Sequence, residues 1–225
     1  DGHKITGLTI NSGDYKGLFG NISGGTVKNL TIENANVAGG RYLGILVGNC
    51  SYGTIENIQI KEGSVTGSSS RVGGMIGSNS ATINNVSISD VNIVSTGSQV
   101  GGLIGYSWGN ISNASVNEVN IQGANNVGGL IGNSYGSIGN AIVAGGSVTG
   151  NSSQVGGLVG YMTNNASINT AGVVNGKIEG NTKVGGLVGE ASSGSIVIEK
   201  AYAQAKVEGK GTGEAYVGGL IGYAG

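Results

Sequence analysis

Short segments in which apolar and polar residues alternate, or nearly alternate, recur along the chain. They read TVKNLTI (26–32), TIENIQI (54–60), TINNVSI (82–88), NISNASV (110–116), SIGNAIV (137–143) and SINTAGV (167–173). A period of two residues is typical of a β-strand with one buried face. A shorter segment also recurs, seven times in all, and ends at an apolar residue: Val37, Val65, Ile93, Ile121, Val148, Ile178 and Val207. Because no helical period occurs anywhere, the pattern predicts an all-β protein.

A glycine-rich motif of the form apolar-Gly-Gly-Leu-Ile/Val-Gly separates these segments. The regular copies are VGGMIG (72–77), VGGLIG (100–105, 127–132 and 217–222) and VGGLVG (155–160 and 184–189). Two early copies diverge, KGLFG (16–20) by its single Gly17 and LGILVG (43–48) by Ile45. The eight copies close at Gly20, Gly48, Gly77, Gly105, Gly132, Gly160, Gly189 and Gly222, with spacings of 28, 29, 28, 27, 28, 29 and 33 residues.

Three short strands in about 28 residues predict one coil of a parallel β-helix, because a propeller blade needs four strands and about 40 residues. The chain is therefore expected to be one solenoid over residues 1–225, with about eight coils and a rod length of roughly 34 Å. The preference of parallel crossovers predicts a right-handed helix. Since the sequence starts at Asp1 and stops abruptly at Gly225, we expect a fragment of a larger protein.

Composition supports this architecture and argues against nucleic acid and membrane as partners. The chain has 48 Gly and no Pro among 225 residues. Proline cannot donate to a ladder that continues on both sides of a strand. Paired motif glycines are explained by closely packed backbone or by a corner at positive φ. With 11 basic and 12 acidic residues the net charge is −1, which gives no reason to expect nucleic acid as a partner. No apolar run predicts membrane insertion by this segment.

Side chains for catalysis or metal binding are scarce. The three aspartates, Asp1, Asp14 and Asp90, form no evident acidic pair of the kind that β-helix polysaccharide hydrolases use. One histidine, His3, and one cysteine, Cys50, cannot supply an ordinary zinc site or an obvious Cys-His pair. The sequence thus predicts no catalytic residues, no metal and no cofactor.

A polar column occupies one position of the second strand: Asn29, Asn57, Asn85, Asn113 and Asn140, followed by Thr170 and Lys200. Side-chain amides stacked at strand spacing donate and accept along a row, which predicts a structural ladder near a bend. The alternative is a row of ligand-reading side chains.

Aromatic residues recur just after the motif. Tyr52, Trp108 and Tyr135 lie three or four residues after a closing glycine, whereas Tyr106, Tyr161 and Tyr223 follow one directly. Coils stacked in register would gather these rings along one edge, where they would contact a sugar or a protein. The alternative is that the rings stack on one another and only cover the loop.

The VGGLIG and VGGLVG copies resemble the GLUG motif of bacterial cell-surface proteins, which include large adhesins and the non-catalytic region of IgA-specific metalloproteases. The opening DGHKITGLTINSGDYKGLFG (1–20) is similar to the lead-in of such arrays. The resemblance implies a secreted or surface-attached stalk or recognition segment. It carries no enzymatic activity to this chain, because no metalloprotease His-Glu-x-x-His is present.

The hypothesis that follows is a non-catalytic, extracellular adhesion or spacer module. Its expected partners are a glycan, or a protein of a host or neighbouring cell. One alternative is a fibre subunit that self-associates end to end through open ladder edges. The other is a polysaccharide-acting β-helix enzyme.

Overall fold

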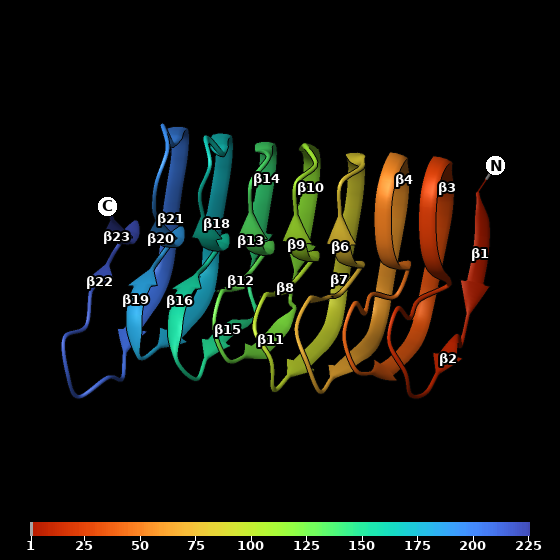
Figure 1. The fold of residues 1–225 in the computed structure, drawn as a ribbon, viewed down its shortest axis with the longest axis horizontal. Coiled ribbons are helices and arrows are strands. Elements are labelled where there is room, and N and C mark those ends of the chain that lie inside the picture. Colours follow the sequence, from red (N-terminus) through yellow and green to blue (C-terminus); the bar gives the residue numbers. More distant parts are fainter. Residues whose placement is uncertain (1) are drawn as a thin grey trace.

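The computed structural model describes residues 2–225. All of the regular secondary structure within these residues is β-strand. All pairing between strands is parallel, as in the registers Val116↔Ile88 and Val127↔Val100. In Figure 1 the coils stand side by side along the long axis, with β1 at one end and β23 at the other. Seven turns separate the first closing glycine, Gly20, from the last, Gly222. The predicted all-β parallel solenoid is therefore confirmed.

The alternating segments form the longest row of stacked strands. This row consists of β1 (His3–Thr6), β3 (Phe19–Gly39), β4 (Val47–Gly67), β7 (Thr82–Ser95), β10 (Ile111–Asn117), β14 (Ser137–Ala144), β18 (Ser167–Gly180) and β21 (Val197–Gly209). The shorter segment that follows either continues the same strand or forms its own, as in β2 (Thr9–Ile10), β11 (Asn120–Gly123) and β15 (Ser147–Gly150).

From the third copy onward, the glycine-rich motif contributes two short strands to each coil, whereas the first two copies make only isolated bridges at Lys16 and Leu43 before the long strands begin. Its first residues form β5 (Val72–Gly73), β8 (Val100–Gly101), β12 (Val127–Gly128), β16 (Ser153–Gly156), β19 (Thr182–Gly185) and β22 (Val217–Gly218). Its last residues open β6 (Ile76–Asn79), β9 (Ile104–Ser107), β13 (Ile131–Ser134), β17 (Val159–Met162), β20 (Val188–Ala191) and β23 (Ile221–Ala224). Where three strands per coil were expected, a coil such as 111–134 has four, because two motif residues interrupt the motif strand.

Each coil turns at residues in the left-handed conformation, which recur in three columns. The first column is the predicted asparagine row, with φ of 55° at Asn57 and 52° at Asn85. The second includes Asp90 at 56°, and the third, directly before the motif, includes Tyr42 at 57° and Arg71 at 65°. Asparagine tolerates this conformation better than other residues with a side chain, which explains its place at the first corner.

Motif glycines serve close backbone approach, because the positive φ values within residues 2–225 fall outside the motif. A Cβ at Gly105 would lie 2.6 Å from Val72 N and 2.7 Å from Arg71 C, where ordinary contact is 3.4–4 Å. A Cβ at Gly160 would lie 2.5 Å from Val127 N. Each closing glycine from Gly48 onward thus crosses the corner of the preceding coil, and of the two sequence-based explanations close packing applies.

The core is a set of apolar columns that run along the inside of the solenoid. The motif leucines Leu103, Leu130, Leu158 and Leu187 are fully buried, as are Ile60, Ile88 and Ile93 of the long strands. The final coil differs, since Val217 and Leu220 are 46% and 40% exposed. Their counterparts Val184 and Leu187 lie beneath that coil and are inaccessible. Stacking by the next coil is therefore what buries each layer.

Candidate binding face

The third corner of the coils brings two columns of side chains together on the surface. One column precedes the motif and contains Tyr15, Tyr42 and Arg71, and the other follows the closing glycine and contains Tyr106. Because each closing glycine packs against the corner of the preceding coil, a residue before one motif copy contacts the residue after the next copy. Thus Arg71 lies over Tyr106, with its Cζ 4.2 Å from the ring centroid.

Tyr106, Trp108 and Tyr135 form a compact cluster at this corner. The rings of Trp108 and Tyr135 are stacked, with centroids 4.0 Å apart and planes 18° apart. The ring of Tyr106 packs against both, with its centroid 6.4 Å from that of Trp108 and 5.4 Å from that of Tyr135. Trp108 Nε1 donates a hydrogen bond to the Tyr106 hydroxyl at 2.9 Å. The indole N–H is thereby satisfied, while half of the Trp108 surface remains exposed to solvent.

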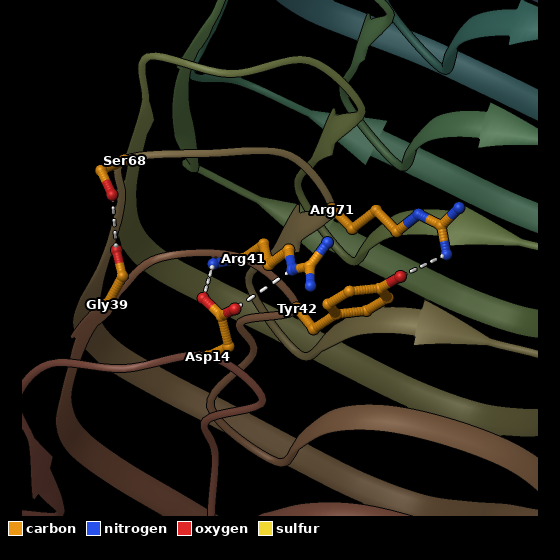
Figure 2. Close-up of polar contacts among 6 residues, drawn as sticks. All are labelled: Asp14, Gly39, Arg41, Tyr42, Ser68 and Arg71. Atoms are coloured by element: carbon orange, nitrogen blue, oxygen red, sulfur yellow. Dashed lines mark hydrogen bonds and ion pairs between the residues drawn. The ribbon is translucent and has the colours of Figure 1, made fainter.

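The cluster continues toward the N-terminus through Arg71, Tyr42 and Tyr15. Tyr15 and Tyr42 are stacked with centroids 4.4 Å apart and planes 7° apart. Arg71 Nη1 donates to the Tyr42 hydroxyl at 3.0 Å, as Figure 2 shows. We name Tyr15, Tyr42, Arg71, Tyr106, Trp108 and Tyr135 the aromatic face. At strand spacing it extends about 20 Å along the rod.

An ion pair supports the aromatic face from the side. Asp14 accepts the Arg41 backbone N–H at 3.0 Å and the Arg41 Nε at 3.1 Å (Figure 2). The backbone N–H, together with the guanidinium, holds the pKa of Asp14 below its usual value despite partial desolvation. Arg41 also lies 5.5 Å from the Tyr42 ring centroid. The loop before the second motif copy is thus tied to the loop before the first.

The structure separates the aromatic residues that the sequence placed on one edge. Tyr52 is 71% exposed and makes no ring contact within residues 2–225. Tyr161 aligns with Asn133 and Glu190 and likewise has no aromatic neighbour in that part of the chain. Tyr223 pairs with Tyr216 at 5.2 Å, at the far end of the rod. Tyr106, Tyr161 and Tyr223 thus share one column, as coils stacked in register require, but Asn133 and Glu190 lie between them and keep their rings apart.

Tyr15, Tyr42 and Arg71 were missed by sequence reasoning. Each directly precedes a motif copy, a position also held by Gln99 and Lys183 in later coils. The position before the last copy is again a tyrosine, Tyr216, but no residue between Tyr42 and Tyr216 at this position is aromatic, so the recurrence was easy to overlook. The available signal was the constant offset from the motif, combined with the neighbouring column.

A charged group lies beyond Tyr161 on the same corner. Lys183 Nζ is 2.7 Å from Glu190 Oε2, and Gln154 Nε2 donates to the same oxygen at 2.8 Å. Lys183 Nζ also lies 4.4 Å from the Tyr223 ring centroid. The corner therefore changes from aromatic to charged along the rod.

The predicted asparagine row lies at the first corner, on a different side of the coil. Asn57 Nδ2 donates to Asn29 Oδ1 at 2.8 Å, and Asn85 Nδ2 donates to Asn57 Oδ1 at 2.7 Å. Asn140 Nδ2 donates to Asn113 Oδ1 at 3.2 Å. The row is broken between Asn85 and Asn113, whose Nδ2 donates to Asn84 instead. A shallow groove of about 410 Å³ follows the first three asparagines, flanked by Thr31, Gln59 and Ser87.

Replacing Asn57 by alanine is expected to lower the free energy of unfolding by about 1–2 kcal/mol, because alanine is strained at this left-handed corner. The change also removes two amide hydrogen bonds. Asn57→Gly removes the same bonds without the strain, so it is expected to cost less. Urea denaturation measures both values. Equal losses for the two variants would contradict the role assigned to the backbone conformation.

A lysine–glutamate cluster surrounds the largely buried Glu179, where β18 pairs with β21. Lys177 Nζ is 2.6 Å and Lys210 Nζ 3.1 Å from the Glu179 carboxylate. The hydrogen bond from Lys177, followed by that from Lys210, lowers the pKa of Glu179 to about 2. Stability from this group is therefore present above the ordinary glutamate pKa of about 4.3 and is lost as the pH falls toward 2.

We expect the melting temperature of the native chain to fall between about pH 4.5 and pH 2, partly because Glu179 becomes protonated. Glu179→Gln should remove that part of the pH dependence. Glu199→Gln, on exposed β21 and outside the ion pairs of residues 2–225, should leave it in place. Thermal unfolding monitored at several pH values compares the three proteins, and identical profiles would refute the assignment.

Little in residues 2–225 resembles a site for metal or thiol chemistry. These residues hold no cluster of three or more His, Cys, Asp or Glu side chains suited to a metal ion. Burial raises the pKa of the Cys50 thiol to about 11. Burial, followed by contact with Tyr106, raises the pKa of the Tyr135 hydroxyl. Residues 2–225 also include no helix of the length and apolarity that a bilayer crossing requires.

Comparison with known proteins identifies one repeat. A family model described as the GLUG motif matches residues 96–122, which span the fourth motif copy and the strand segments that follow it. The resemblance stated from the sequence is confirmed at these residues. No curated protein and no solved structure matches the chain.

Proposed function

We propose that this chain is a non-catalytic, extracellular module that spaces and binds, with the aromatic face as its contact surface for a glycan. The observation that carries the proposal is the stacked Trp108–Tyr135 pair, whose indole is half exposed although its N–H is already bonded. A GLUG repeat within a β-solenoid fits a repeat module of a surface protein. In this proposal the chain is secreted or attached to a cell surface.

The chemistry of the aromatic face favours a sugar ligand. Planar rings offer apolar surface to the C–H groups of a sugar ring, and tyrosine hydroxyls bond its hydroxyl groups. Trp108 and Tyr135 are already ordered by their mutual stacking, so binding would cost little side-chain entropy. A protein partner is the other ligand class that an exposed aromatic patch accommodates.

The solenoid supplies a rigid support for that surface. Backbone hydrogen bonds link successive coils even in the turns, for example from Leu103 N to Leu130 O at 2.9 Å and from Leu130 N to Leu158 O at 2.9 Å. The apolar columns are continuous through those coils. In this proposal the mechanism is mechanical, since the rod holds the aromatic face at a fixed position and orientation.

Trp108→Ala is expected to weaken glycan binding by roughly tenfold or more, because a stacked aromatic ring in a binding site contributes about 1–3 kcal/mol. The measurement is a glycan array followed by calorimetric titration of each hit. Tyr202→Ala is the matched control, since Tyr202 is 51% exposed on β21, away from the aromatic face.

Binding that survives Trp108→Ala, or binding lost equally in Tyr202→Ala, would contradict the proposed surface. If only proteins are retained by the native chain and Trp108→Ala releases them, the ligand class changes while the surface stands. Release of shortened sugar products during the titrations would overturn the non-catalytic part of the proposal.

A further inference from the structure

Arg71 is a cation without a carboxylate partner in residues 2–225. The chain has two arginines, Arg41 and Arg71, and both guanidinium groups lie beside the Tyr42 ring, at 5.5 and 5.0 Å from its centroid. Arg41 is neutralised by Asp14 at 3.1 Å. Arg71 makes no such ion pair, although it is partly buried. A partly desolvated charge without a counter-ion favours an anionic ligand.

The position of the Arg71 guanidinium is fixed by four neighbouring groups. It lies between the rings of Tyr42 and Tyr106, at 5.0 and 4.2 Å from their centroids. Nη1 donates to the Tyr42 hydroxyl at 3.0 Å, and Nε donates to Gln99 Oε1 at 3.3 Å. Nη2 makes no hydrogen bond within residues 2–225. The held guanidinium therefore has donor capacity left for a carboxylate, with little ordering cost on binding.

A platform for a sugar ring adjoins this cation. Tyr106 contacts both groups: the Arg71 Cζ lies 4.2 Å from its ring centroid, and the Trp108 indole donates to its hydroxyl at 2.9 Å. One face of Trp108 is covered by Tyr135. In the preceding coil, Trp108 N donates to Asn79 O at 2.8 Å, and the register Asn79↔Ser107 sets the small Ser80 opposite Trp108. Within residues 2–225 the ring contacts of Trp108 are those with Tyr106 and Tyr135.

We propose that Arg71 and Trp108 form a subsite for an acidic sugar, and this proposal rests on the proposed glycan-binding function. The carboxylate of the sugar accepts hydrogen bonds from the Arg71 guanidinium, while a sugar ring packs on the open face of Trp108. A single unpaired arginine on a chain of net charge −1 fits one carboxylate rather than the repeated phosphates of a nucleic acid.

The test uses ligands that differ in charge and little in shape. Trigalacturonate and 3′-sialyllactose are each titrated against their methyl esters, with a sulfated trisaccharide as a further anion. We expect at least one acid to bind roughly tenfold or more tightly than its ester, because a hydrogen bond to a charged group contributes about that much. Raising the salt concentration should reduce this preference.

Two arginine variants separate the subsite from the general charge of the surface. Arg71→Gln should abolish the preference for the acid over its ester, and it should fold, because Gln99 and Gln154 hold the same corner position with φ of 61° and 58°. Arg41→Gln removes a charge beside the same tyrosine, but one already paired with Asp14, so it should keep the preference. Circular dichroism verifies the fold of each variant.

The outcomes distinguish failure of the acidic subsite from failure of the proposed glycan-binding function. Equal binding of acids and esters that is lost in Trp108→Ala would overturn the acidic subsite and leave the glycan-binding face intact. Tighter binding of the sulfated sugar than of both carboxylates would overturn the choice of anion. Failure of every sugar to bind would overturn the subsite together with the glycan part of the proposed function.

Discussion

Gly132→Ala is expected to lower the free energy of unfolding by about 3 kcal/mol or more, the largest effect that we expect from one added methyl group. A Cβ at Gly132 would lie 2.5 Å from Val100 N, 2.6 Å from Gly105 O and 2.7 Å from Gln99 C. All three are backbone atoms of the preceding coil, so no side-chain rotation relieves the clash. The two coils would have to separate locally, which weakens the parallel ladder between them.

Gly139→Ala provides the control for that experiment. Gly139 lies in β14 of the coil that follows, and an added Cβ there would meet only Asn169 O, at 3.8 Å. Its φ is not in the left-handed region, so alanine fits its backbone. We expect a change within about 1 kcal/mol, as alanine also reduces the entropy of the unfolded chain. Equal destabilisation of both variants in urea denaturation would refute the close-approach explanation of the motif.

Leu130→Ala is expected to cost about 2–5 kcal/mol, because it leaves a cavity in a column that has little room to collapse. Leu130 is fully buried, and coils lie over it on both sides along the rod. The same motif position in the final coil is Leu220, which is 40% exposed.

Leu220→Ala therefore matches Leu130→Ala in chemistry and in motif position, while it differs in burial. We expect Leu220→Ala to cost less than about 1.5 kcal/mol, since much of that side chain stays in water in the folded state. Chemical denaturation of the two variants and the native chain measures the difference. A cost for Leu220→Ala as large as that for Leu130→Ala would contradict the view that the following coil buries each layer.

The repeat made most of the fold predictable. Nearly constant spacing between Gly77, Gly105 and Gly132 places chemically equivalent residues in register, so one coil specifies its neighbours. Alternation in segments such as TINNVSI assigned the buried face only in part: Val86 and Ile88 are buried as alternation requires, whereas Ile83 is buried out of phase with them, across the left-handed corner at Asn85. The division of the motif into two strands was harder to predict from the sequence. It depends on the backbone path of Gly129 and Leu130, which lie between β12 and β13.

The aromatic face was only partly predictable, for a geometric reason. Trp108 and Tyr135 lie three residues after a closing glycine and Tyr106 directly after one, and all three were found from the sequence, whereas Tyr42 and Arg71 belong to a column that precedes the motif. The two columns meet because the closing glycines cross the preceding corner at backbone contact distance. That crossing is a property of the packed coils, and no spacing within one repeat shows it.

The most direct test of the proposed function uses the fluorescence of Trp108, the single tryptophan of the chain. Glycan binding on the half-exposed indole should shift its emission to shorter wavelength and saturate with ligand concentration. Soluble quenchers should also become less effective, because the bound sugar covers the ring. Sugars that bind by calorimetry while leaving Trp108 emission and quenching unchanged would contradict the central claim that the aromatic face is the binding surface.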